Sequence, residues 1–146
     1  MIYSTGYTGK SIVDLAPMLS RLNAVLIDIR YSPASWVPQW RFQELQALLG
    51  ESYYWVRYLG NRNYKSGGDI EIDNLDAGLR ELGRIMTATQ KSAILLCGCE
   101  KYRSCHRKVV AEAIVRLRDL KVSEILDWKE SGNANREIAW LQQEFL

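Results

Sequence analysis

Short apolar runs alternate with amphipathic segments along this chain. Two runs, AVLIDIR at 24–30 and SAILLCG at 92–98, are almost continuously aliphatic, which is typical of parallel strands covered by helices on both faces. Further strands are predicted where β-branched and aromatic residues gather, at 2–5, 53–59 and 122–128. Apolar residues at helical spacing predict intervening helices over 10–23, 39–50, 73–88, 104–120 and 134–145.

This alternation of strands and helices predicts the fold class. It favours a three-layer α/β sandwich of the Rossmann-like kind, with a mostly parallel sheet of about five strands and helices on both faces. We expect a single domain over residues 1–146, with the C-terminal helix 134–145 docked on it. Ligands of such sheets bind beyond the carboxyl ends of the strands, so the loops that follow the strands should meet on one rim. The stretch GNRNYKSGGDIEIDN, at 60–74, has glycines, asparagines and basic residues but no apolar period, and it is the predicted lid of that site.

Composition narrows the range of partners. The 19 Lys and Arg against 17 Asp and Glu give a net charge of +2, too small to indicate a protein that coats nucleic acid or a membrane surface. The sequence has neither a signal peptide nor an apolar run long enough to span a bilayer, so we expect a cytoplasmic protein without a membrane partner. Three cysteines within nine positions favour reduced thiols over a disulfide framework. No cofactor and no metal is predicted, and no oligomeric state follows from the sequence.

The segment LLCGCEKYRSCHRK, at 95–108, concentrates the candidate chemistry. Cys97 closes the predicted strand, and Cys105 and His106 fall in the first turn of the helix that follows. Free N–H groups at a helix start favour a thiolate or a phosphate, and Arg107 could add a bidentate contact to an oxyanion. Cys97, Cys105 and His106 are therefore the candidate catalytic residues, whereas Cys99 is interpreted as incidental.

Asp28 and Arg30 form a second candidate element. They lie two residues apart at the carboxyl end of a central strand, and therefore on one face of it. Either they pair only with each other, or Arg30 reaches the ligand crevice. The polar turn that follows includes Ser32.

Four stretches together resemble the bacterial domain of unknown function 488: TGY at 5–7, LIDIRYSPAS at 26–35, YLGN at 58–61 and LLCGCEKYRSCHR at 95–107. The resemblance implies an α/β fold and a site made of Gly6, Asp28, Arg30, Ser32 or Ser35, Pro33, Leu59, Gly60, Cys97, Glu100, Cys105, His106 and Arg107. The chain departs from the family pattern at Trp36, at Asn61 and in the spacing between Cys97 and Glu100.

These observations lead to a functional hypothesis with alternatives. The leading one is an enzyme-like site that binds a phosphate-bearing ligand, a nucleotide or a nucleic-acid end, through Arg30, Arg107 and the amides of the helix start. Gly6, Asp28, Ser32 and Glu100 complete the expected binding residues. A non-catalytic binding module, or a thiol enzyme resembling rhodaneses or tyrosine phosphatases that uses Cys97 with Arg103, is an alternative, so the sequence leaves open whether the domain is an enzyme. A redox switch between Cys97 and Cys105 also stays open.

Overall fold

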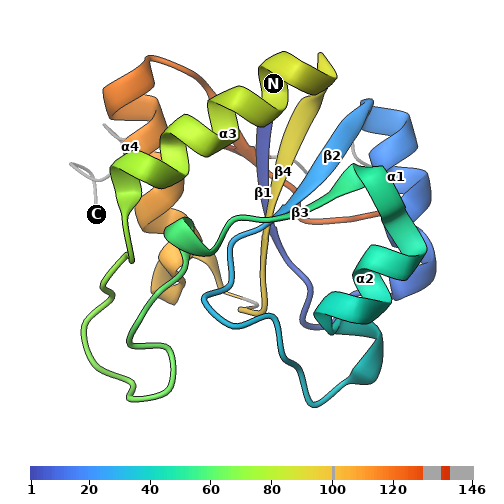
Figure 1. The fold of residues 1–146 in the computed structure, drawn as a ribbon, viewed down its shortest axis with the longest axis horizontal. Coiled ribbons are helices and arrows are strands. Elements are labelled where there is room, and N and C mark those ends of the chain that lie inside the picture. The colour runs from blue at the N-terminus through green and yellow to red at the C-terminus, as the bar shows by residue number, and fades with distance from the viewer. Residues whose placement is uncertain (100, 130–135, 139–146) are drawn as a thin grey trace.

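A six-stranded sheet forms the centre of the molecule (Figure 1). This computed structural model describes residues 1–99, 101–129 and 136–138. The strand order is β3-β2-β4-β1-β5-β6, and only the pairing of β5 with β6 is antiparallel. The strands are β1 (Ile2–Gly6), β2 (Ala24–Asp28), β3 (Tyr53–Trp55), β4 (Ser92–Cys97), β5 (Val122–Glu124) and β6 (Arg136–Ile138).

Helices cover both faces of this sheet (Figure 1). The α-helices are α1 (Leu15–Leu22), α2 (Phe42–Leu49), α3 (Leu75–Thr89) and α4 (His106–Arg118). Short 3-10 turns lie at η1 (Ile12–Asp14), η2 (Pro38–Trp40), η3 (Gly50–Ser52), η4 (Arg57–Leu59) and η5 (Tyr102–Ser104).

Two hydrophobic clusters, one on each face, explain why these elements form. Successive residues of a strand point to opposite faces, so Leu26 of β2 packs with α1 and α2 while Val25 packs with α3 and α4. Both β2 and β4 are buried along almost their whole length, which is why they read as continuous aliphatic runs. The predicted three-layer α/β sandwich with a mostly parallel sheet is confirmed.

Three elements differ from the sequence prediction. Strand β3 ends at Trp55 rather than near Leu59, because the chain turns into η4 and the side chain of Leu59 becomes fully buried. Strand β5 ends at Glu124, short of residue 128. The helix predicted over 134–145 lies mostly outside the described residues, but 136–138 pair with β5 as strand β6, so the prediction of a helix is wrong at these three residues. Pairing with an otherwise open sheet edge overrides local helical periodicity.

The carboxyl ends of the central strands lie next to one another. Gly6 at the end of β1 is in register with Cys97 at the end of β4, and Asp28 at the end of β2 is in register with Leu96. The loops that leave these strands therefore meet on one rim, as expected for a parallel sheet. Among the described ranges, no helix combines the length and the apolar character needed to cross a bilayer.

Candidate functional site

Three thiols converge where β4 passes into α4. Cys97 is the last residue of β4, Cys99 lies two residues later in the loop, and Cys105 is the N-cap of α4. Their sulfur atoms all lie within 4.8 Å of one another, and those of Cys97 and Cys105 are 2.7 Å apart. Cys97 and Cys105 are buried and Cys99 is exposed, so the cluster presents one thiol to solvent and keeps two behind it.

The start of α4 holds Cys105 in place. Cys105 has an extended backbone, and its sulfur accepts a hydrogen bond of 3.5 Å from the backbone N–H of Arg107. A side chain that accepts from the first turn of a helix satisfies one of the donors that the helix itself leaves free. This sulfur therefore occupies part of the helix start that the sequence suggested for an oxyanion.

His106 is fixed by a single backbone contact. Its Nε2 lies 2.7 Å from the carbonyl oxygen of Ile29, and since a carbonyl can only accept, Nε2 carries the proton. Nδ1 is then the unprotonated nitrogen, and it faces the sulfur of Cys105 at 3.8 Å. Burial lowers the pKa of His106 from its ordinary value, although the bond to Ile29 acts in the opposite direction. A neutral imidazole in this position can accept the proton of the Cys105 thiol.

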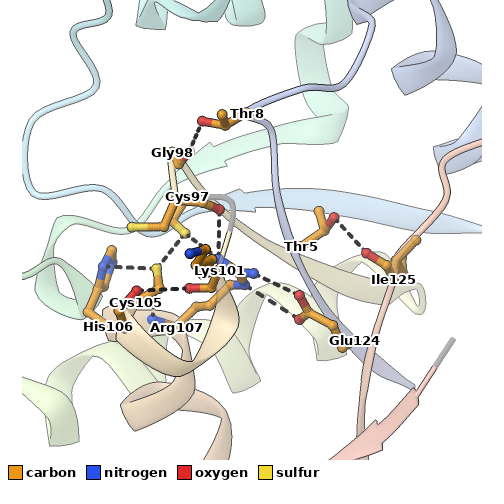
Figure 2. A network of polar contacts seen from close by, with 12 residues as sticks. Thr5, Thr8, Cys97, Gly98, Lys101, Cys105, His106, Arg107, Glu124 and Ile125 are labelled. Atoms are coloured by element: carbon orange, nitrogen blue, oxygen red, sulfur yellow. Dashed lines mark hydrogen bonds and ion pairs between the residues drawn. The ribbon is translucent and has the colours of Figure 1, made fainter.

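Arg107 turns inward, toward the sheet (Figure 2). Its guanidinium makes two hydrogen bonds to Glu124 of β5, of 2.7 and 3.4 Å, and donates to the sulfur of Cys97 at 3.2 Å and to the carbonyl of Cys99 at 2.8 Å. Only 1% of its surface is exposed. Arg107 therefore contacts the thiol cluster from the side of the sheet and does not line the pocket. The sequence had led us to expect that it would contact a ligand there. It does not, because its guanidinium is bound to the buried carboxylate of Glu124.

The three thiols have different acidities because they share hydrogen bonds. Hydrogen bonds donated by the thiols of Cys105 and, to a smaller extent, Cys97 bring the pKa of Cys99 well below its ordinary value. Burial raises the pKa of Cys97 far above that value. A hydrogen bond donated by the thiol of Cys97 lowers the pKa of Cys105. The hydrogen bond that Cys105 donates to Cys99, together with the burial of Cys105, outweighs this effect and raises the pKa of Cys105 to about 11. Of the three thiols, Cys99 is therefore the one that loses its proton most readily.

Arg30 and Asp28 form a second buried ion pair at the end of β2. The guanidinium donates to both carboxylate oxygens, at 2.8 and 2.6 Å, and the hydroxyl of Tyr53 donates to the same carboxylate at 2.5 Å. A third guanidinium nitrogen lies 3.4 Å from the hydroxyl of Tyr7. Arg30 therefore pairs with Asp28 but not exclusively, because its side chain also lines the pocket.

This pocket has a volume of about 500 Å³ and opens on the carboxyl rim. Four loops contribute to it, those after β1, β2, β3 and β4, together with the start of α4. Its lining residues are Tyr7, Arg30, Tyr31, Ser32, Ala34, Asn61, Asn63, Tyr64, Gly67, Gly68, Ile70, Gly98, Cys99, Ser104 and His106. Most of the lining residues are polar or aromatic, and one thiol and one guanidinium are among the groups that reach the pocket.

The predicted site residues that the structure describes divide into three groups. Arg30, Ser32 and His106 line the pocket, and Cys97, Cys105, Asp28 and Arg107 lie behind its wall. Gly6 is a packing position: a Cβ there would come within 1.7 Å of the Cys99 carbonyl oxygen. Glu100 lies outside the described residues.

Cys99 is the residue that sequence reasoning missed. Two residues after Cys97, it continues the alternation of β4, and residues two apart in an extended chain point to the same side. That spacing could have indicated that the sulfurs of Cys97 and Cys99 lie together. Asn61, Asn63 and Tyr64 also line the pocket. Apart from the length of the loop that contains them, nothing in the sequence indicated this.

Fold and site together define a three-layer α/β domain with a pocket on its carboxyl rim and a cluster of three thiols, one of which lines that pocket. Comparison with protein-family models, with curated proteins and with solved structures gives no match to this chain. The resemblance to the domain of unknown function 488 therefore stays a prediction.

Proposed function

We propose that the rim pocket is the active site of a small enzyme that carries out thiol–disulfide exchange. The arrangement of the three thiols carries this proposal: Cys99 is exposed at the pocket, and Cys97 and Cys105 are buried 2.7 Å apart directly behind it. An attacking thiol next to a resolving thiol is the arrangement that such exchange requires.

The first step takes place at Cys99. Its thiolate attacks one sulfur of a disulfide held in the pocket, so that a bond forms between Cys99 and that half of the substrate while the substrate's own S–S bond breaks. The other half leaves as a thiolate and takes up a proton from solvent.

The second step uses Cys105. This thiol passes its proton to Nδ1 of His106, 3.8 Å away, and its sulfur attacks that of Cys99, which lies within 4.8 Å. A bond forms between Cys99 and Cys105, and the first half of the substrate leaves as a thiolate. The substrate has then gained two electrons and the protein has lost two, and a low-molecular-weight thiol returns the protein to its reduced form.

Arg30 supports a substrate that carries an anionic group. The hydrogen bonds to Asp28 and Tyr7 engage three of the five N–H donors of its guanidinium, and the side chain lines the pocket. A carboxylate or phosphate of the substrate would bind there. The proposal thus retains Arg30, but not Arg107, as an anion-binding residue. Cys97 is a poor nucleophile in a phosphatase-like reaction because it is fully buried, whereas Arg103 is exposed.

Oxidised glutathione serves as the probe disulfide in the test. The reduced protein, freed of metal ions with a chelator, is mixed with it and quenched with acid, and each cysteine is assigned by mass spectrometry. We expect transient glutathionylation of Cys99 followed by a Cys99–Cys105 disulfide.

Variants make the test specific. Cys105→Ala should trap glutathione on Cys99, Cys99→Ser should abolish the fast reaction, and Ser20→Ala, at an exposed position of α1 outside the pocket, should react as the wild type does. Glutathione found first on Cys97 or Cys105, or an unchanged rate in Cys99→Ser, would contradict the proposal.

A further inference from the structure

The thiol cluster is also a set of metal ligands. Three sulfur donors within 4.8 Å of one another, with an imidazole nitrogen beside them, match the donor types of tetrahedral zinc sites. We propose that the reduced site binds one zinc ion through the sulfurs of Cys97, Cys99 and Cys105, with Nδ1 of His106 as the fourth ligand. Zinc binding here does not require the exchange reaction proposed above.

The distances fit such an ion after one small movement. Bonds of about 2.3 Å from zinc to sulfur place tetrahedral sulfur ligands roughly 3.8 Å apart. The sulfurs of Cys97 and Cys105, now at 2.7 Å, would have to separate by about 1 Å. A rotation of the Cys105 side chain provides this, since its sulfur is held to the backbone of α4 by one long contact of 3.5 Å.

His106 is already oriented as a ligand. Metal-binding histidines generally donate their other ring N–H to a carbonyl or carboxylate, which fixes the tautomer and the direction of the lone pair. The contact between Nε2 and the carbonyl of Ile29 has this role and leaves Nδ1 directed at the cluster. The distance from Nδ1 to the Cys105 sulfur, 3.8 Å, is close to the roughly 3.6 Å expected between a nitrogen and a sulfur ligand of one zinc ion.

The surroundings of the cluster include a donor for a coordinated thiolate and a route of entry for an ion. Arg107 donates to the sulfur of Cys97 at 3.2 Å, as groups around a metal centre commonly do for a coordinated thiolate. Cys99 opens on the pocket and gives an ion a route of entry. Thiolate and imidazole ligands select zinc over magnesium and calcium, which prefer oxygen.

In the linear sequence these four residues do not have the spacing of a common zinc site, but the fold brings them together. Cys105 and His106 are adjacent in sequence, and the spacing of the cysteines is not a common closed pattern. The fold places the end of β4 against the first turn of α4, so Cys105 reaches Cys97 across that junction while His106 approaches from the side of Ile29. Because the same sulfurs would form the Cys99–Cys105 disulfide, zinc binding and oxidation exclude each other.

Cobalt titration tests the proposal directly. The reduced wild-type protein is titrated with Co²⁺ under anaerobic conditions, and Zn²⁺ is then added. We expect one equivalent of Co²⁺ to give intense visible bands of a tetrahedral ion and sulfur-to-cobalt charge transfer, both removed by one equivalent of Zn²⁺. Weak bands of an octahedral ion, or no charge-transfer band, would overturn the assignment.

Variants identify the ligands. Cys99→Ser, at an exposed position, should keep the fold, lose about one third of the charge-transfer intensity and bind at least about 10-fold more weakly. His106→Gln should weaken binding without loss of charge-transfer intensity, and Ser20→Ala, at an exposed position of α1, should bind as the wild type does. Unchanged binding in Cys99→Ser would contradict the proposal. A negative cobalt titration would not contradict the proposed exchange reaction, because the exchange assay uses metal-free protein. A negative exchange assay would likewise not contradict zinc binding.

Discussion

The carbonyl oxygen of Cys99 lies 1.7 Å from the position that a Cβ on Gly6 would occupy. The end of β1 and the loop after β4 are thus in direct backbone contact, and only a residue without a side chain fits there. Cys99 is positioned by this contact as well as by its own loop.

Gly6→Ala should therefore displace the Cys99 segment. A new methyl group in a packed position costs about 1–3 kcal/mol, which we expect as a lower free energy of unfolding in urea denaturation. The displacement should also slow alkylation of Cys99. The matched control is Gly83→Ala in α3, where the added Cβ meets nothing within 4 Å apart from its chain neighbours and the backbone of its own helix, so that removal of a helical glycine should stabilise the protein by about 0.5–1 kcal/mol. Equal losses in the two variants would contradict the role of the close approach.

The ion pair between Arg107 and Glu124 should be one of the most sensitive points of the fold. Both side chains are almost completely buried, so Glu124→Gln leaves a buried guanidinium without its carboxylate, and we expect a loss of about 3–5 kcal/mol in urea denaturation. Glu81→Gln, which removes the partner of the largely exposed Arg84, is the control and should cost less than about 1 kcal/mol. Similar losses in the two variants would show that Arg107 does not depend on Glu124.

Tyr53→Phe should weaken the structure beneath the pocket. Its hydroxyl donates to the buried carboxylate of Asp28 at 2.5 Å, and loss of a hydrogen bond to a charged, buried group costs about 1–3 kcal/mol. Measurement of the free energy of unfolding at neutral pH tests this.

The same variant should change the response to alkaline pH. Burial, and then the charge of Asp28, raise the pKa of Tyr53 above its ordinary value. In the unfolded chain the hydroxyl of Tyr53 loses its proton at about pH 10, whereas in the folded protein it keeps that proton. The free energy of unfolding of the wild type therefore falls as the pH rises above this value. Between about pH 9 and 11 the free energy of unfolding should fall more steeply for the wild type than for Tyr53→Phe. Parallel slopes would contradict the pKa shift.

Hydrophobic periodicity was sufficient to predict the layers of the fold but not the length of every strand. The runs in β2 and β4 are buried on both faces, and such strands have an unambiguous pattern. Strand β6 could not be predicted, because residues 136–138 pair with the edge of β5, and that pairing depends on the folded sheet rather than on local sequence.

The candidate site was partly predictable for the same reason. Cys97, Cys105 and His106 are close in sequence and separated only by the junction of β4 and α4, so their clustering followed from the predicted elements. The partner of Arg107 could not be deduced: Glu124 is 17 residues away on β5, on the far side of β1 from β4. The sequence shows that Arg107 is charged, but its ion pair with Glu124 becomes evident only in the folded structure.

Alkylation of the three thiols tests the central claim most directly, namely that Cys99 is the reactive group at the pocket. The folded, reduced and metal-free protein is treated with iodoacetamide, and the modification of each cysteine is followed over time by mass spectrometry. We expect Cys99 to be alkylated first, and Cys97 and Cys105 only when the protein is unfolded in denaturant. Alkylation of Cys97 or Cys105 before Cys99, or an unreactive Cys99 in the folded protein, would contradict the account.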